Sequence, residues 1–475
     1  MRRLLGKLDG LFRSTAPGPF PYTSAILSTI KRILNTIVLK QSISLQEYFE
    51  RIVVGYSQLA AETQSGPLGN EAVLGMLGAV INIVVRNCPE GTVQRVADNF
   101  YTLFRQTSFN TSHIRLSAYF SSPSAAKVIL STWMLAALPK ALDAAVLLKG
   151  SVADGIEDLV LFASQTPSQT IELNCLRQVA LYINKHLSNK DLILASNLLD
   201  KTLQSLYSND SNPDYGLRLS FFVTKALVLR LAPQSNASLE SLINLLSSPN
   251  TSIARQAALL FRAILAPDDV LSKENYAQIR LLAPQRVFQS LVPLISTRFR
   301  SSQSPAEKEN YLIALSGILA TVPSDIVMPE LPTLLPLLLQ SLDISDQNVK
   351  TATLETLAVV ITTNPSALEE SGHVAALTKR LLATAALKNN TGSSAQQPSL
   401  PRTRRLATRC ITLMSKYLAG STARANPLLS LKGEVLRGLL PVLDDPKRDV
   451  RKEAVDARAA WLRGVDDEGD EDDDE

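Results

Sequence analysis

Apolar residues recur at helical spacing along the chain, in segments separated by turns rich in Pro, Gly, Ser or Asn. Recurrence at i, i+3, i+4 and i+7 is typical of amphipathic helices, whereas strands alternate with a period of two. Hydrophobic residues make up 45% of the chain but aromatic residues only 5%. Aliphatic side chains of this kind fill helix–helix interfaces well. The sequence therefore predicts an all-α fold.

A shorter pattern repeats in the second half. Turns at Ser248-Pro249, Ser345-Asp346-Gln347 and Asp444-Asp445-Pro446 each follow one apolar helix and precede another. In the second helix a small residue lies four positions after an apolar one: Ile253 and Ala257, Val349 and Thr353, Val450 and Ala454, and more loosely Thr403 and Ala407. The small residue lets two helices approach, and the apolar stripe is buried against the next pair. A period in the forties predicts a right-handed α-solenoid of the HEAT/armadillo type with about nine or ten helix pairs.

The pattern divides the chain into four parts. We expect an N-terminal segment at 1–22, whose order the sequence leaves open, and divergent helical repeats at 23–214. The C-terminal HEAT repeats follow at 215–464 and contain a flexible loop at 388–401, which lacks apolar periodicity. Residues 465–475 are expected to form a disordered acidic tail, because clustered acids repel one another and have nothing apolar to bury.

Charge is distributed unevenly along the chain. The net charge is +4, but nine of the last ten residues are acidic, and the remaining 48 bases and 35 acids give the body +13. Bases cluster just after the predicted loop and again in the last repeat, at Arg404, Arg405, Lys447, Arg448, Arg451 and Lys452. These clusters are consistent with a docking surface for an acidic protein, a solvated helix face or a nucleic-acid contact. Aromatic residues are not interleaved with them, which argues against stacking on single strands.

Groups that could perform catalysis or bind a metal are sparse. His113, His186 and His373 have no Cys or carboxylate at ligand spacing, and the sequence contains neither a phosphate-binding Gly-rich loop nor a nucleophile elbow. Three scattered cysteines suit a reducing compartment, the cytosol or nucleus. We therefore expect no catalytic residue, no metal and no cofactor.

Several other residues are interpreted as structural. The longest apolar stretch, residues 72–85, is shorter than a membrane span and predicts a buried core helix in which Gly75 and Gly78 allow close packing. The carboxylate pairs at 268–269 and 444–445 are expected to lie in turns between helices and to cap the helix that follows. Trp461 is expected to close the core of the last repeat, with a partner anchor as the alternative.

Five ordered segments carry a family resemblance: Val223–Arg230, Gln285–Phe288, Asn310–Leu312, Pro329–Leu335 and Leu443–Arg458. In this order, over residues 215–463, the chain resembles the C-terminal half of the methyl-methanesulfonate-sensitivity HEAT-repeat adaptors. The resemblance implies a client-recruiting scaffold of the cytosolic iron–sulfur cluster assembly targeting complex, present in nucleus and cytoplasm. It implies binding to a WD40 subunit, to a small cluster-handling subunit and to apo iron–sulfur clients in DNA repair, replication and transcription. Members of that family are longer than this chain, so functions of their N-terminal repeats are not implied.

On this interpretation the last repeats hold the assembly partners and a basic concave surface receives clients, without membrane contact or direct nucleic-acid binding. The residues proposed for contact are Lys225, Arg230, Arg286, Arg404, Arg405, Lys447, Arg448, Arg451, Lys452 and Trp461. Two alternatives remain open. The +13 body favours a nucleic-acid-associated HEAT protein, and an unrelated transport or phosphatase scaffold would require the ordered motifs to be coincidental.

Overall fold

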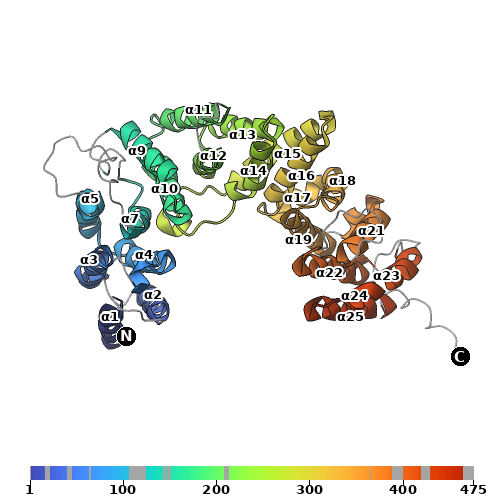
Figure 1. Cartoon of the computed structure of the whole chain (residues 1–475), viewed down its shortest axis with the longest axis horizontal. Coiled ribbons are helices and arrows are strands. Elements are labelled where there is room, and N and C mark those ends of the chain that lie inside the picture. Colours follow the sequence, from blue (N-terminus) through green and yellow to red (C-terminus); the bar gives the residue numbers. More distant parts are fainter. Residues whose placement is uncertain are drawn as a thin grey trace. The chain divides into compact units, whose positions relative to one another are not determined.

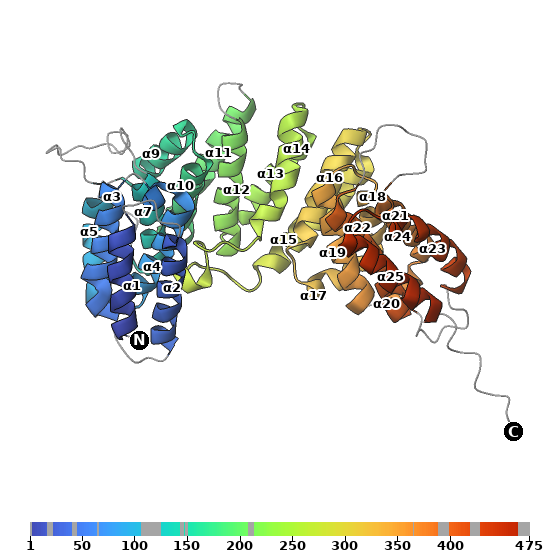
Figure 2. The same ribbon diagram turned by 60° about the horizontal axis from the view of Figure 1, so that its bottom comes forward.

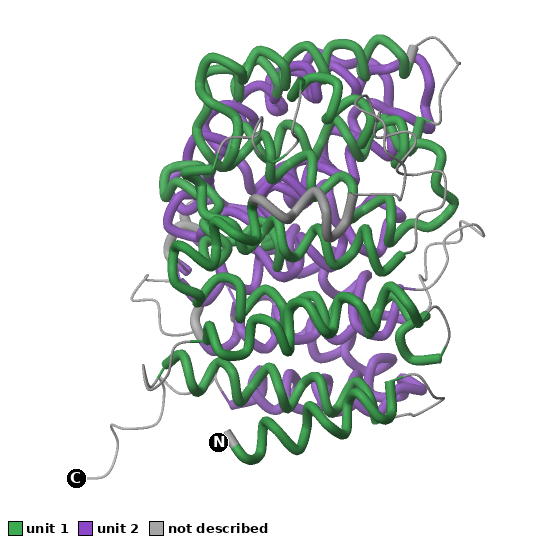
Figure 3. The backbone as a smooth tube through the Cα atoms, turned by 90° about the vertical axis from the view of Figure 1, so that its left-hand side faces the viewer, with its two compact units in different colours: residues 1–238, 267–283 green, residues 239–266, 284–475 purple. Residues whose placement is uncertain are grey.

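The chain folds into two compact groups of helices. A computed structural model describes residues 2–16, 22–39, 45–63, 66–105, 125–142, 147, 151–207, 213–363, 365–387, 399–418 and 428–463. Within these ranges the backbone forms helices joined by turns, and none of them contains a strand. Unit 1 comprises residues 1–238 and 267–283, and unit 2 comprises residues 239–266 and 284–475 (Figure 3). The all-α prediction is confirmed. The predicted change from divergent to regular repeats at residue 215 stays a prediction.

Unit 1 is built from successive helix pairs (Figure 1). Its main helices are α1 (Arg2–Thr15), α2 (Thr23–Leu39), α3 (Gly55–Glu62), α4 (Glu71–Arg86), α5 (Glu90–Arg105), α7 (Ala125–Ala137), α9 (Val152–Gln165), α10 (Gln169–Leu181), α11 (Ile193–Tyr207) and α12 (Pro213–Leu229). One series packs in succession, α2 on α4, α4 on α7, α7 on α10 and α10 on α12. Other helices lie beside this series, with α1 on α2, α9 on α10 and α11 on α12. The segment whose order the sequence left open thus begins with a helix that contributes buried Leu5 and Phe12.

Helix α4 is the predicted apolar core helix. Asn70 caps its start, because its Oδ1 accepts hydrogen bonds from the N–H groups of Ala72 (2.9 Å) and Val73 (3.3 Å). Its side chains from Leu77 to Val85 are all buried. Asn82 Nδ2 donates to the carbonyl oxygen of Trp133 on α7 at 2.9 Å, so the one polar side chain in this run is satisfied by the neighbouring helix.

The two glycines of α4 differ in their surroundings. A Cβ atom at Gly78 would lie 2.2 Å from Cδ1 of Trp133, whereas a Cβ atom at Gly75 would meet nothing within 4 Å. The predicted close-packing role is therefore confirmed for Gly78 and wrong for Gly75.

We expect Gly78→Ala to lower the free energy of unfolding by about 1–3 kcal/mol, because the methyl group must displace the Trp133 ring from a packed interface. Gly75→Ala is the matched control on the same helix, and it should raise stability by up to about 1 kcal/mol through helix propensity alone. Urea unfolding followed by circular dichroism measures both. Equal effects of the two substitutions would contradict the close contact between α4 and α7.

Residues 267–283 return to unit 1 and tie its helices together. Asp268 pairs with Arg177 of α10 at 2.9 Å, and its Oδ1 accepts from the N–H groups of Val270 and Leu271. Burial alone would raise the pKa of Asp268, but Arg177 and these backbone donors hold it below its usual range. At α4, the Tyr276 hydroxyl donates to the carbonyl oxygen of Arg86 at 3.1 Å. Asp268 thus caps a turn, and the prediction that it caps the following helix is wrong, because no helix follows it directly.

The side chain of Lys185 links this segment to α7. Its buried Nζ donates to the carbonyl oxygens of Ala136 (2.8 Å), Leu135 (3.4 Å) and Asn275 (2.9 Å). Burial lowers the pKa of Lys185 to about 7. Lys185 thus binds carbonyl oxygens at the C-terminal end of α7, of which that of Leu135 also accepts from the Leu138 N–H.

Unit 2 repeats the same arrangement (Figure 2). The division between the units falls within α13 (Ser235–Asn244) and at the start of α15 (Ala283–Ser301). The remaining main helices are α14 (Thr251–Leu260), α16 (Pro305–Leu319), α17 (Ser324–Val327), α18 (Leu331–Ser341), α19 (Gln347–Thr363), α20 (Pro365–Glu370), α21 (Val374–Ala385), α22 (Pro401–Leu418), α23 (Lys432–Gly438), α24 (Leu440–Leu443) and α25 (Arg448–Arg463). Helix α14 packs on α16, α16 on α19, α19 on α22 and α22 on α25.

Four of these helices, α14, α19, α22 and α25, carry the predicted repeat pattern. Its apolar and small residues are buried in every instance, including the looser one at Thr403 and Ala407. Thr353 shows why a small residue is needed, because its Oγ1 lies 3.0 Å from Oγ of Ser316 on α16. Stacked helix pairs with this pattern confirm the HEAT/armadillo-like fold. The predicted loop, residues 388–401, lies mostly outside the described residues, as does the acidic tail.

Candidate docking surface on the last described repeat

A capped turn positions helix α25. Oδ1 of Asp445 accepts from the Lys447 N–H at 2.8 Å, and the carbonyl oxygen of Asp445 accepts from Arg451 Nη1 at 2.7 Å. The capping role predicted for this carboxylate pair is confirmed at Asp445. From this turn α25 extends for four turns, with Val450, Ala454 and two further residues of the same face buried. The exposed side chains of α25 include Arg448, Lys452 and Val455.

Arg404 belongs to the interior, contrary to our prediction of a contact role. It lies on α22, where Nε and Nη2 reach the two carboxylate oxygens of Asp445 at 2.7 and 3.1 Å. The two side chains are 4% and 1% exposed, and Arg404 also donates to the carbonyl oxygen of Ser399. Burial alone would raise the pKa of Asp445, but the hydrogen bonds from Arg404 and Lys447 hold it below its usual range. This ion pair joins the last two repeats.

Trp461 is also an interior residue. Its side chain is fully buried, and Nε1 donates to the carbonyl oxygen of Ile411 on α22 at 2.8 Å. The prediction that Trp461 closes the core of the last repeat is confirmed. The alternative, a partner anchor, is wrong for this conformation, because no face of the ring is exposed.

A charged groove of about 400 Å³ lies between α22 and α25. Bases line it at Arg409, Lys416 and Arg463, and acids at Glu453 and Asp456. Burial raises the pKa of Glu453, although the nearby Arg409 opposes this shift. The groove therefore carries charges of both signs, which compensate one another across the two helices.

The opposite side of α25 carries no acid. We call it the end face and define it by Arg448, Lys452, Val455, Arg458 and Leu462. Successive helix residues are rotated by about 100°, so Arg448, Lys452, Val455 and Leu462 lie on the side turned away from Val450 and Ala454. Arg458 is half-buried and lies at the margin of this side. Val455 is 56% exposed and Leu462 is 46% exposed. Among the described residues, none forms a salt bridge with Arg448, Lys452 or Arg458. A partly apolar surface rimmed by available cations is a candidate docking site for an acidic protein surface.

The other predicted contact residues differ in how exposed their side chains are. Lys447, Arg405 and Arg286 are exposed, and Arg451 is half-buried by its bond to the turn. Lys225 is buried in unit 1, where burial lowers its pKa while Asp268 opposes the shift. Arg230, also in unit 1, donates to the carbonyl oxygens of Ile183 (2.6 Å) and Leu187 (3.2 Å). The contact prediction is therefore wrong for Lys225, which is buried. Arg230 is half-buried and supports neighbouring helices, and its contact role stays a prediction.

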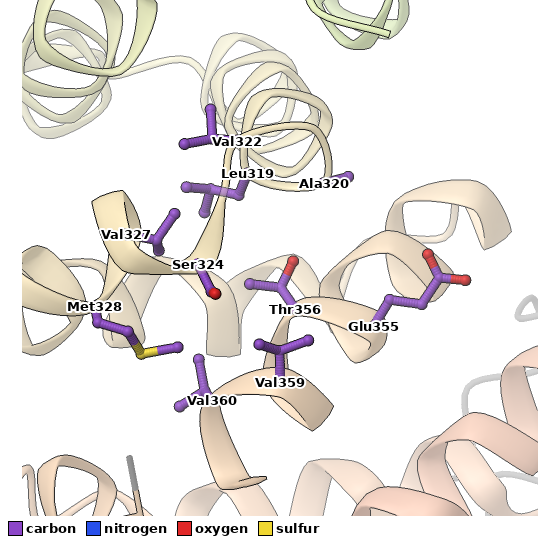
Figure 4. A pocket seen from close by; sticks show the side chains of 10 residues that line it. All are labelled: Leu319, Ala320, Val322, Ser324, Val327, Met328, Glu355, Thr356, Val359 and Val360. Carbon is purple, nitrogen blue, oxygen red and sulfur yellow. The ribbon is translucent and has the colours of Figure 1, made fainter. Parts of the chain in front are cut away.

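The sequence did not predict an apolar cleft in unit 2. It has a volume of about 240 Å³ and lies where α16, α17 and α19 meet. Val327, Met328 and Val360 point toward a common space in Figure 4. At the margin of the cleft, Val359 is 41% exposed, which no pattern in the sequence indicated.

Groups with metal-binding or redox chemistry do not gather in the part of the chain that the structure describes. No cluster of three or more His, Cys, Asp or Glu side chains occurs there. Cys175 and Cys410 are buried and Cys88 is half-buried, all as free thiols. Burial raises the pKa of Cys88 to about 11 and that of Cys410 to about 12, so these thiols are poor ligands and nucleophiles at neutral pH. His113 lies outside the described residues. Of the described helices, none has both the length and the apolar character that crossing a bilayer requires.

Stacked helix pairs, a repeated apolar–small pattern and an exposed end face define the class of protein. The chain is an α-solenoid of the HEAT/armadillo type. The model of the family described as RNAPII transcription regulator C-terminal matches residues 1–415, and the chain belongs to this family. The resemblance predicted from the sequence is thus confirmed. It extends to the first two hundred residues, for which no motif had indicated it.

Individual relatives support this assignment. The chain is 36% identical over 248 residues to the MMS19 nucleotide excision repair protein homolog of Xenopus laevis, covering 52% of this chain and 22% of the relative. It is 33% identical over 307 residues to the DNA repair/transcription protein mms19 of Schizosaccharomyces pombe, covering 64% and 28% respectively. Among solved structures, an importin-β chain aligns with a TM-score of 0.41 at 13% identity, over 98% of this chain and 58% of that one. The matched part spans about a quarter of the length of these curated relatives.

Proposed function

We propose that this chain is a non-enzymatic scaffold of the cytosolic iron–sulfur protein assembly targeting complex. In this role it holds the WD40 subunit and the small cluster-handling subunit and recruits apo-clients of DNA repair, replication and transcription, in nucleus and cytoplasm. Family membership supports the proposal, and the relatives carry names of DNA repair and transcription proteins. The end face of α25 is the observation that carries it, since it combines exposed apolar side chains with available cations.

The scaffold role requires no cluster on the chain itself. The free thiols lie far apart in sequence, and the described residues offer no set of three ligands. Cluster binding requires converging thiolates or imidazoles. We therefore propose that the iron–sulfur cluster is cargo of the partner subunits and never a resident cofactor of this chain.

A charge-reversal variant tests the docking surface. We expect Arg448→Glu, Lys452→Glu and Arg458→Glu together to reduce recovery of the small subunit in affinity purification to background. The cause is that three attractive contacts become repulsive at the centre of the interface. Arg451 is left unchanged, because its bond to Asp445 holds the turn and its loss would confound the result.

The matched control carries the same change in charge at exposed bases elsewhere, Lys273→Glu, Arg300→Glu and Lys379→Glu. This control should retain the partner, and circular dichroism should show unchanged helicity for both variants. Undiminished recovery with the end-face variant would disprove docking at α25.

A nucleic-acid-associated role is the second candidate, and the excess of bases outside the tail favours it. Under that alternative, a variant with neutral residues in place of the nine tail acids would bind duplex DNA with a steep dependence on salt. Absence of such binding at low salt would exclude it. Family membership makes coincidental motif matches untenable, so the unrelated transport or phosphatase scaffold is set aside.

A further inference from the structure

The cations of the end face differ from three bases of α22 that lie close to acids. On α22, Arg402 pairs with Glu355 at 2.8 Å, Arg404 pairs with Asp445, and Arg409 lies near Glu453. On α25, the acids lie on the side that faces α22, so the end face contains bases without acids. Arg448, Lys452 and Arg458 therefore remain without a carboxylate partner among the described residues.

The sequence that follows α25 has the opposite charge. Nine of the ten residues 466–475 are acidic, and α25 ends only three positions earlier, at Arg463. Twelve residues follow Arg463, and an extended chain of that length spans about 40 Å. Helix α25 has 16 residues and is therefore about 24 Å long. The tail is thus long enough to turn back and reach Arg448 at the far end of the helix.

We propose that the acidic tail, residues 466–475, is an intramolecular ligand of the end face of α25. Its carboxylates pair with Arg448, Lys452 and Arg458, and being tethered beside this surface gives them a high effective concentration. The tail has no apolar side chain after Val465, so it matches the cations but leaves Val455 and Leu462 uncovered. A partner that offers both acidic and apolar groups can therefore displace it.

This displacement gives the tail a regulatory role, which rests on the proposed function. The tail suppresses weak binding of merely acidic or polyanionic molecules, because they compete for the same cations without gaining the apolar contact. The docking partner gains that contact and binds in spite of the tail. The occupancy of the end face by the tail does not depend on which partner binds there, so it can be measured on the isolated chain.

The test measures the reactivity of Lys452 with an acetylating reagent, read by mass spectrometry on the full-length chain. The comparison variant has Asn and Gln in place of the nine tail acids. At low salt we expect Lys452 to react at least threefold more slowly in the wild-type chain than in the neutral-tail variant. Lys379, an exposed lysine on α21, should react equally in both. Raising the salt to about 0.5 M should abolish the difference, because the Debye length shrinks to a few ångströms.

Carbodiimide cross-linking supplies the second readout. Joining of Lys452 to the peptide that contains residues 466–475 supports the proposal, provided that mixed light- and heavy-isotope protein shows the link within one chain. Links only between chains would show a contact between two copies and overturn it. Equal Lys452 reactivity in both variants at low salt would also overturn it. Neither of these outcomes affects the proposed scaffold function. Conversely, if the end-face variant still recovers the small subunit, the proposed binding of the tail is not affected.

Discussion

Arg404→Met is expected to lower the free energy of unfolding of the last repeats by about 3 kcal/mol. The substitution leaves the Asp445 carboxylate buried at 1% exposure without its cation. Removing one member of a buried ion pair costs far more than the pair itself contributes, because the remaining charge keeps its desolvation penalty. Asp445 also caps the turn before α25, so its altered charge state weakens the attachment of that whole helix.

Two further variants separate charge from packing. Arg402→Met, two residues earlier on α22, removes an exposed ion pair with Glu355 and should change stability by less than about 1 kcal/mol. The double variant Arg404→Met with Asp445→Leu should recover much of the loss, because an apolar pair carries no uncompensated charge. It cannot recover the turn cap, worth about 1 kcal/mol.

Trp461 provides the measurement. It is buried in α25 and bonded to α22, so its fluorescence during urea unfolding reports on the last repeat. Trp133 lies in unit 1 and would be replaced by Phe in all variants to remove its signal. If Arg404→Met and Arg402→Met shift the unfolding midpoint equally, the pair is no more important than a surface contact.

The repeat pattern was predictable because it depends on local sequence. Ile253, Val349 and Val450 each recur with a small residue one turn later, and helix packing requires that geometry wherever it occurs. The burial of Arg404 and Lys225 was harder to predict, because each side chain interacts with an acid far along the chain. Arg404 pairs with Asp445, and Lys225 lies near Asp268. A signal did exist for Arg404. Thr403, Ala407 and Ile411 place it beside the buried stripe of α22, where an unpaired cation cannot remain.

The return of residues 267–283 to unit 1 could not be predicted. No periodic pattern marks the segment, and its contacts are isolated hydrogen bonds and ion pairs to α4, to α10 and to Asn184 and Lys185 after α10. Such contacts depend on the position of each helix end, which periodicity does not give. In contrast, the end face of α25 could be drawn from the sequence alone, because helical geometry places its bases and acids on different sides. The sequence did not indicate which of these cations form ion pairs within the fold.

Acidification is expected to destabilise unit 1 through His186. This residue ends the short helical turn Tyr182–His186 that continues α10, and its side chain is buried. Nδ1 lies 2.7 Å from the carbonyl oxygen of Leu142 and donates to it, while the buried Nε2 has no described hydrogen-bond partner. Burial, together with the adjacent Lys185, lowers the pKa of His186 to about 3, although the hydrogen bond to the Leu142 carbonyl opposes this shift. A proton on Nε2 would be a charged donor without an acceptor.

The direction of the pH effect follows from proton binding. Between pH 6.5, the usual histidine pKa, and about 3, the unfolded chain binds a proton at His186 that the folded chain does not. Stability contributed by neutral His186 is therefore fully present above pH 6.5 and is lost as the pH falls, at up to about 1.4 kcal/mol per unit. Urea unfolding at pH 7.0, 6.0 and 5.0 should reveal a loss of about 1–2 kcal/mol over this range.

His186→Asn isolates this contribution from that of the carboxylates, which titrate mainly below pH 5. Asparagine can still donate to the Leu142 carbonyl but takes up no proton, so its stability should change little between pH 7.0 and 5.0. His373→Asn, in the turn before α21, serves as the matched control and should keep the wild-type slope. If His186→Asn keeps that slope as well, the buried imidazole becomes charged in the folded chain, and Lys185 beside it must then give up its proton or move.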